Sequence, residues 1–293
     1  MRLDNISPTN QIRVLSGSNM HRRIIVPSRV NIIGEHTDYA GGLALPFATE
    51  KFLELTIKSR DYDCQGDETV VKLWQAVSDL PVELTIESDI PIGKGMSSSA
   101  ALCLAIVIGA KPNLSKLETC KEAQRIEHLV LETECGLLDQ IAMMFAQKNY
   151  FSLIDFSNLK IEHIEIPDEW IFKLVDSKVH RKLSDTNYNQ ISDYSKKHVI
   201  EENSRVRRAL SSSKSQLGLL LNDSHRSLQK LGVSNVEVDK LVEQLQHTEG
   251  VHGARMMGGG FGGMILTLVE NENILPDYEV VTSSGPPLFE ELS

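Results

Sequence analysis

The segment 91–107 constrains the fold most, because a glycine-rich turn leads there directly into an apolar stretch. Gly93 and Gly95 permit backbone conformations that a side chain would block. The residues 100–107 are good helix formers without a breaker, so they predict a buried helix. Between the turn and this helix lie three serines: Ser97, Ser98 and Ser99. Free N–H groups and the helix dipole favour an anion at such a helix start, so the turn predicts a phosphate site.

The loop does not name its ligand. It is not a Walker A loop, because Lys94 lies between the glycines and no Gly-Lys-Ser/Thr follows. It also lacks the third glycine of the dinucleotide fingerprint at the required spacing. The serine hydroxyls can hold phosphate oxygens or Mg²⁺, or they can simply cap a buried helix. For this segment alone, both interpretations stay open.

The composition limits the class of protein. A chain of 293 residues can form one large or two ordinary domains, and 41% hydrophobic with 24% charged residues suits a globular protein. The formal net charge of −10 argues against a general nucleic-acid binder. No apolar run reaches membrane-span length and no signal core is present, so we expect a cytoplasmic protein. Four cysteines without Cys-x-x-Cys spacing indicate reduced thiols and no zinc site: Cys64, Cys103, Cys120 and Cys135.

Hydrophobic periodicity predicts the following elements. The predicted strands are 22–27, 30–33, 43–48, 52–59, 69–74, 82–88, 150–155, 161–166 and 171–176. The predicted helices are 100–107, 117–133, 137–147, the later half of 184–208, 210–231 and 236–247. The segment 258–263 has five glycines in six positions, which predicts a tight hairpin between strands at 251–257 and 264–269 and a close approach of backbone to backbone or ligand.

A short polar loop follows the strand-like residues 30–33. Its side chains can all form hydrogen bonds: Glu35, His36, Thr37 and Asp38. Such a group can recognise several hydroxyls of one small polyol. An isolated cluster of this kind is more often a solvated turn, so the cluster alone decides nothing.

Several segments, taken together and in order, resemble the GHMP small-molecule kinases. The first is similar to the signature of the galactokinases, Gly-Arg-Val-Asn-Leu-Ile-Gly-Glu-His-Thr-Asp-Tyr, with Ser28 and conservative changes as the differences. The others are similar to the family's phosphate loop, to two shorter motifs and to its third motif. The matching segments are 29–46, 91–101, 136–140, 175–189 and 253–263. The resemblance spans residues 22–269.

The resemblance implies an α+β protein with the two-domain GHMP kinase fold. An N-terminal, ribosomal-protein-S5-like domain would cover residues 1–155, and a C-terminal, ferredoxin-like domain would cover residues 156–293. It implies an ATP-dependent sugar kinase that phosphorylates the anomeric hydroxyl of galactose. The alternatives are a kinase of another sugar (an amino sugar, a pentose or a heptose) and a regulator that binds galactose and ATP with little catalysis. The intact serines of the phosphate loop favour the enzyme.

The resemblance also implies a site, residue by residue. The catalytic pair is Arg29 and Asp139. The sugar would contact Glu35, His36, Asp38 and Tyr188. The nucleotide would bind at Gly93, Gly95, Ser97, Ser98 and Ser99. Mg²⁺ would be held by Ser99 and Glu127.

Three departures from the family pattern bear on the identity of the sugar. The family usually has Thr at Met257 and often Cys at Met264, and the arginines that normally follow its Tyr-Asn pair are absent after Tyr188. These departures leave the catalytic pair untouched. We expect a monomer whose partners are a small sugar and ATP, with no nucleic acid and no membrane.

Overall fold

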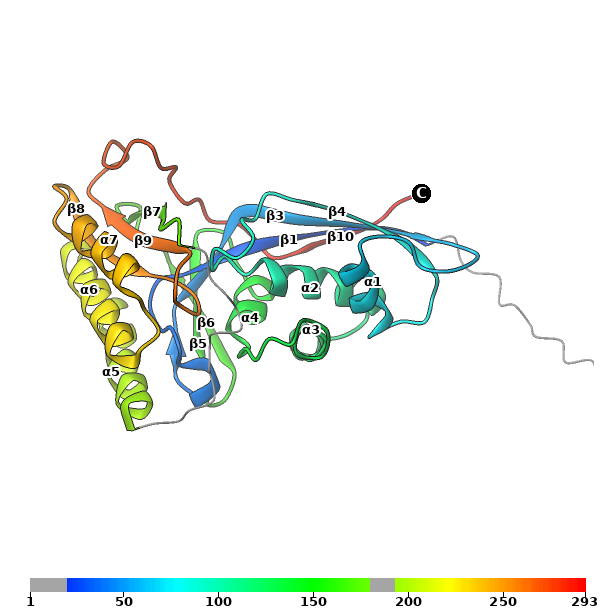
Figure 1. Cartoon of the computed structure of the whole chain (residues 1–293), viewed down its shortest axis with the longest axis horizontal. Coiled ribbons are helices and arrows are strands. Elements are labelled where there is room, and N and C mark those ends of the chain that lie inside the picture. Colours follow the sequence, from blue (N-terminus) through cyan, green and yellow to red (C-terminus); the bar gives the residue numbers. More distant parts are fainter. Residues whose placement is uncertain (1–19, 180–192) are drawn as a thin grey trace, which may run out of the picture.

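The computed structural model describes residues 20–179 and 193–293, and its largest sheet is antiparallel with the order β10-β1-β3-β4 (Figure 1). Its strands are β1 (His21–Asn31), β3 (Pro46–Ser59), β4 (Val82–Ser88) and β10 (Leu288–Glu291). The register of β1 against β3 shifts between Pro27 and Ser28. A proline lacks the N–H that the ladder needs, and a register shift is a position where a strand tolerates one.

Four helices lie along one face of this sheet (Figure 1). They are α1 (Glu68–Gln75), α2 (Ser98–Ala110), α3 (Lys116–Leu131) and α4 (Leu138–Met144). The helix α2 is apolar along most of its length and packs directly on the strands. A Cβ at Gly109 would lie 2.2 Å from the side chain of Ile57 and 3.1 Å from that of Ile24. The predicted helix at 100–107 is confirmed, and its C-terminal end packs closely against β1 and β3.

The predicted strand at 69–74 is wrong, because these residues form most of α1. The side chain of Asp67 caps the helix by accepting hydrogen bonds from the N–H groups of Thr69 and Val70. The buried residues Val70, Leu73 and Trp74 recur at helical spacing. A short apolar segment with two valines fits a strand and a helix equally well, and the aspartate cap decides it.

A small second sheet has the order β2-β5-β6. The predicted strand at 43–48 is divided between β2 (Leu43–Ala44) and the start of β3. The strands at 150–155 and 161–166 are confirmed as β5 (Tyr150–Asp155) and β6 (Lys160–Glu165). The short 3₁₀ helix η1 (Asp38–Ala40) precedes β2 and lies in the polar loop of the signature.

The later half of the chain contains a third sheet with the order β7-β9-β8. Its strands are β7 (Ile171–Asp176), β8 (Val251–Met256) and β9 (Met264–Val269), and its helices are α5 (Asp193–Ala209), α6 (Lys214–Leu231) and α7 (Val236–Gln246). The predicted hairpin of β8 and β9 is confirmed. Gly218 of α6 lies against β8, where a Cβ would be only 2.2 Å from the carbonyl oxygen of His252.

The segment after β9 returns to the first sheet. The N–H of Val281 donates to the carbonyl of Phe172 at 2.8 Å, the N–H of Ser284 donates to the carbonyl of Ala48 at 2.8 Å, and β10 then pairs with β1. A single apolar core joins the two halves of the chain. It contains sheet residues of the first half together with Phe172 and Leu266 of the second half. The boundary between residues 155 and 156 stays a prediction. Among the helices within 20–179 and 193–293, none has the length and apolarity to cross a membrane.

Candidate active site

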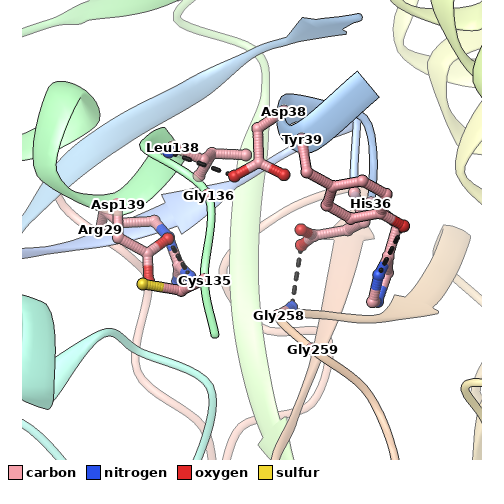
Figure 2. A pocket seen from close by; sticks show the side chains of 11 residues that line it. Arg29, His36, Asp38, Tyr39, Cys135, Gly136, Leu138, Asp139, Gly258 and Gly259 are labelled. Carbon is pink, nitrogen blue, oxygen red and sulfur yellow. Dashed lines mark hydrogen bonds and ion pairs between the residues drawn. The ribbon is translucent and has the colours of Figure 1, made fainter. Parts of the chain in front are cut away.

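Segments far apart in the sequence meet at one pocket (Figure 2). They are the end of β1, the loop around η1, the start of α4 and the glycine-rich hairpin. The pocket is lined by Arg29, Glu35, His36, Asp38, Tyr39, Cys135, Gly136, Leu138, Asp139, Gly258 and Gly259. Residues from three separate motifs of the sequence, 29–46, 136–140 and 253–263, therefore line a single cavity.

The centre of the site is the carboxylate of Asp139, in the first turn of α4. The guanidinium of Arg29, whose side chain is only 4% exposed, donates from Nε to Oδ1 of Asp139 at 2.8 Å. The hydroxyl of Ser97 donates to Oδ2 at 2.6 Å. Arg29 also donates to the carbonyl of Gly95 at 2.7 Å. One cation thus connects the carboxylate to the phosphate loop, and both carboxylate oxygens have a fixed partner.

Glu35 is buried on the hairpin side of the pocket. Its Oε1 accepts a hydrogen bond from the N–H of Gly258 at 2.8 Å and forms an ion pair with Arg255 at 3.3 Å. Arg255 is fully buried and also donates to the carbonyls of Asn31 and Ile32. The sugar signature and the glycine-rich hairpin are therefore joined through one carboxylate and one guanidinium.

His36 and Tyr39 lie on the opposite side of the pocket from Arg29 and Asp139 (Figure 2). His36 has a φ of 57°, in the left-handed region, where histidine is one of the few enriched residues other than glycine. Its Nδ1 lies 3.4 Å from the hydroxyl of Tyr39. The imidazole is therefore in reach of a residue of η1.

Asp38 faces α4 across the pocket. Its Oδ2 accepts a hydrogen bond from the N–H of Leu138 at 3.3 Å. Burial and, to a lesser extent, the negative charge of Asp139 raise the pKa of Asp38 from 3.8 to about 6. A Cβ at Gly136 would lie 1.8 Å from the same oxygen, so glycine is required for Asp38 to take this position.

The predicted magnesium residues also lie together. The hydroxyl of Ser99 donates to Oε1 of Glu127 at 2.7 Å, and the amide of Gln140 donates to Oε2 at 2.7 Å. Burial raises the pKa of Glu127 to about 7, although the hydrogen bond from Ser99 acts in the opposite direction. Within 20–179 and 193–293, no group of three or more His, Cys, Asp or Glu residues is arranged so that it could hold a metal ion.

The phosphate loop is open on one side and packed on the other. Gly93 and Gly95 have φ values of 70° and 77°. A Cβ at Gly95 would lie 3.0 Å from the carbonyl oxygen of Met257, whereas a Cβ at Gly93 would meet nothing within 4 Å. Ser97 has a φ of 62° and precedes α2, and its side chain donates to Asp139 rather than capping the helix. Ser98 is the first residue of α2. Tyr188 lies outside the described residues.

Helix α5 carries a buried carboxylate that sequence reasoning missed. Glu202 accepts hydrogen bonds from the N–H of Gly34 at 3.0 Å and from the hydroxyl of Ser224 at 2.6 Å. Burial alone would raise its pKa, but the charges of Arg205 and His198 hold it below the ordinary value. Glu202 therefore anchors the turn that leads into the signature loop.

The residues that the sequence did not reveal, Glu202, His198 and Arg255, differ in how recognisable they are in the sequence. The side chain of Glu202 is 0% exposed and that of its neighbour Glu201 is 45% exposed, so the sequence of this charged helix cannot tell them apart. His198, which lies 2.8 Å from the carbonyl of Glu35, is equally inconspicuous on that helix. Arg255 did carry a signal, because it is a charge between the apolar residues Ala254 and Met256 of a predicted strand.

Known proteins share these motifs. A model of the galactokinase galactose-binding signature matches residues 17–57, and the models of the N- and C-terminal GHMP kinase domains match residues 68–147 and 202–275. A galactokinase from Thermotoga neapolitana is 33% identical over 84% of this chain and 89% of its own length. The chain belongs to the galactokinase family of GHMP kinases. A galactokinase from Glaesserella parasuis is 30% identical over 88% of each chain.

Solved structures show the same fold as this galactokinase-family chain. The Lactococcus lactis galactokinase complexed with galactose has a TM-score of 0.82 at 23% identity, covering 92% of this chain and 95% of that one. A D-glycero-D-manno-heptose 1-phosphate kinase from Bacteroides thetaiotaomicron has a TM-score of 0.64 at 14% identity, covering 93% and 99%. Membership of the galactokinase family makes the chain a sugar kinase that uses ATP, and the predicted α+β GHMP kinase fold is confirmed.

Proposed function

We propose that the chain transfers the γ-phosphoryl group of ATP to the anomeric hydroxyl of galactose. The observation that carries the proposal is the carboxylate of Asp139, fixed by Arg29 and Ser97 between the signature pocket and the phosphate loop. The relatives named galactokinase and the solved galactose complex support galactose as the sugar. The galactose-binding signature lies along the same pocket.

In this proposal Asp139 accepts the proton of the attacking hydroxyl. A sugar hydroxyl is a weak nucleophile at neutral pH, and a positioned base assists its attack. Arg29 orients the carboxylate and supplies fixed positive charge beside the transferred group. The polyphosphate lies against the loop of Gly93 and Gly95 at the start of α2, where backbone N–H groups and the helix dipole favour negative charge.

The sugar is proposed to lie against Glu35, His36 and Asp38, with Tyr188 as a further contact. Carboxylates accept hydrogen bonds from hydroxyls, so these side chains can distinguish hydroxyl positions on the ring. A site that pairs a hydroxyl rejects the analogue that lacks it or turns it away, because a buried polar group is then left unpaired. We therefore expect a strong preference for galactose over glucose, which differ at C4.

Mg²⁺ is proposed to bind between Ser99 and Glu127, directly or through water. The residues fit the ion, because Mg²⁺ takes oxygen ligands and usually binds through one or two carboxylates together with substrate phosphates. The hydroxyl of Ser99 already points at the buried carboxylate of Glu127, and Gln140 holds the other oxygen. When bound, the ion would neutralise charge on the phosphates during transfer.

An ADP-release assay over a panel of sugars tests the proposal. The panel contains galactose, glucose, galactosamine, a pentose and a heptose, and ³¹P NMR locates the phosphate on the product. We expect the highest kcat/KM with galactose and a sugar 1-phosphate as product. Asp139→Asn, which keeps the shape of the side chain, is the matched control for background activity. A higher kcat/KM with another sugar would make that sugar the proposed substrate in place of galactose. Binding of galactose and ATP without ADP release would indicate the regulator.

A further inference from the structure

Lys94 has no role in the proposed function, yet it lies in the middle of the phosphate loop. It is the only charged residue in the segment 91–99. The glycines on either side, Gly93 and Gly95, both have left-handed backbone conformations, which sharply turn the chain at this lysine. Arg29, the other cation at this loop, is already bound to Asp139 and to the carbonyl of Gly95. The loop's own positive charge therefore comes from Lys94.

The ammonium group of Lys94 is held by Asp176 at the end of β7. Its Nζ lies 2.8 Å from Oδ1 of Asp176, and the two side chains are 19% and 35% exposed. Burial alone would raise the pKa of Asp176, but the hydrogen bonds from Lys94 and from the N–H of Lys178 keep it below its ordinary value. A pair that solvent partly reaches contributes little net stability, so breaking it costs little.

The backbone of Lys94 is fixed on one side of the loop, and the other side is open. The N–H of Met264 donates to the carbonyl of Lys94 at 2.9 Å, and a Cβ at Gly263 would lie 2.6 Å from that carbonyl oxygen. A Cβ at Gly93 would meet no heavy atom other than those of its chain neighbours within 4 Å. A ligand can therefore approach the loop beside Lys94 while the backbone of Lys94 stays in place.

We propose that Lys94 exchanges Asp176 for the polyphosphate of ATP and so acts as a nucleotide-binding residue. The inference rests on the proposed function, because it takes the polyphosphate to lie on this loop. A polyphosphate carries more negative charge than one carboxylate, and an ammonium group binds it as a flexible point charge. Asp176 then holds the lysine in place only while the nucleotide site is empty. In this exchange Lys94 strengthens ATP binding and Asp176 weakens it.

Calorimetry of nucleotide binding without sugar tests the exchange. Lys94→Met keeps the length of the stem and should weaken ATP binding about tenfold, the usual effect of losing one charge-assisted hydrogen bond. AMP, which has one phosphate, should lose much less. Asp176→Asn should tighten ATP binding several-fold, because the lysine no longer has to leave a carboxylate. The double variant should bind ATP like Lys94→Met alone.

Lys72→Met is the matched control. Lys72 forms an exposed ion pair with Glu68 on α1 at 2.6 Å and lies outside the phosphate loop. This variant should leave ATP binding unchanged. Equal weakening of ATP binding in Lys94→Met and Asp176→Asn would show a structural tie and overturn the exchange. Unchanged affinity in either variant would overturn it as well. Absence of ATP binding by the unmodified protein would instead contradict the proposed function.

Discussion

The two halves of the proposed active site, one for the sugar and one for the nucleotide, are built differently. In the proposed sugar half, buried charged side chains hold the signature loop, through Arg255 on Glu35 and through Glu202 on the N–H of Gly34. In the nucleotide half, glycine backbone forms the loop, and its charged side chain, Lys94, is partly exposed to solvent. We therefore expect the first half to be ready to recognise hydroxyls before any ligand arrives, and the second to keep a charge that a nucleotide can draw from Asp176.

The difference predicts how each half responds to substitution. A buried charge that loses its partner remains desolvated, which is costly. A partly exposed ion pair such as that of Lys94 costs less to break. We therefore expect substitutions in the proposed sugar half to alter stability and sugar binding together, and substitutions in the proposed nucleotide half to alter ATP binding with a smaller loss of stability.

The largest effect is expected where the halves meet, at Asp139. Asp139→Ala removes the proposed base and should lower kcat by about 10²–10⁴-fold. Binding of ATP and of galactose should persist, because neither the phosphate loop nor the signature loop changes. Steady-state kinetics beside calorimetry for both ligands measures this. A variant with normal kcat would exclude Asp139 as the base, and loss of both ligands would show that the residue is structural.

Arg255→Met should break the sugar half selectively. It leaves the buried carboxylate of Glu35 without its cation, which should cost roughly 3–5 kcal/mol of unfolding free energy. The KM for galactose should rise while the Kd for ATP stays constant. Urea unfolding and calorimetry give both values. Arg226→Met, at an exposed arginine paired with Asp223, is the matched control and should cost no more than about 0.5 kcal/mol.

A second substitution sharpens that prediction. In Glu35→Gln with Arg255→Met, the buried charge is gone together with its partner, so the double variant should recover part of the lost stability. Sugar binding should not recover, because Glu35 is proposed to contact the hydroxyls. Strict additivity of the two stability losses would contradict a direct coupling between these side chains.

Asp38→Asn should have opposite effects on stability and on sugar binding. Folding raises the pKa of Asp38 from 3.8 to about 6, so its stabilising effect is complete below about pH 4 and is lost as the pH rises through about 6. The neutral amide avoids this loss, and the ligand-free variant should melt a few degrees higher at pH 7.5 and equally at pH 4. Galactose should bind it more weakly. Thermal melts from pH 4 to pH 7.5 measure the effect. The same dependence of melting temperature on pH in both proteins would refute it.

The smallest effects are expected in the nucleotide half. Gly93→Ala and Gly95→Ala each place a side chain in a left-handed conformation, at a cost of about 1–2 kcal/mol. Only Gly95→Ala also approaches the carbonyl of Met257, at 3.0 Å. We therefore expect weaker ATP binding and a larger loss of stability in Gly95→Ala than in Gly93→Ala. Equal losses measured by urea unfolding would mean that the hairpin yields at this contact.

The sequence predicts some residues of the site and not others. The residues proposed to face the ligands lie in contiguous motifs, so Arg29, Ser97 and Asp139 could be named, and the structure brings them together. The residues that hold the signature loop come from a distant helix and strand. Glu202 looks like any exposed helix charge until the fold buries it. Tertiary burial, which no local pattern records, decides its role.

The error at α1 has a different cause. The segment 69–74 has apolar and β-branched residues that satisfy strand and helix patterns alike. Asp67, directly before the segment, is a helix-start signal that the sequence does carry, and its capping hydrogen bonds favour the helix together with the burial of Leu73 and Trp74. In contrast, α2 was predictable because its apolar run admits burial on nearly every side.

Calorimetry of galactose binding without nucleotide tests the central claim most directly, namely that the sugar half is formed before ATP arrives. The account predicts that galactose binds the nucleotide-free protein and binds Lys94→Met with the same Kd. It predicts weak or no binding to Glu35→Gln. Binding of galactose only after a non-hydrolysable ATP analogue has been added, or a weaker Kd for galactose in Lys94→Met, would contradict the separation of the two halves.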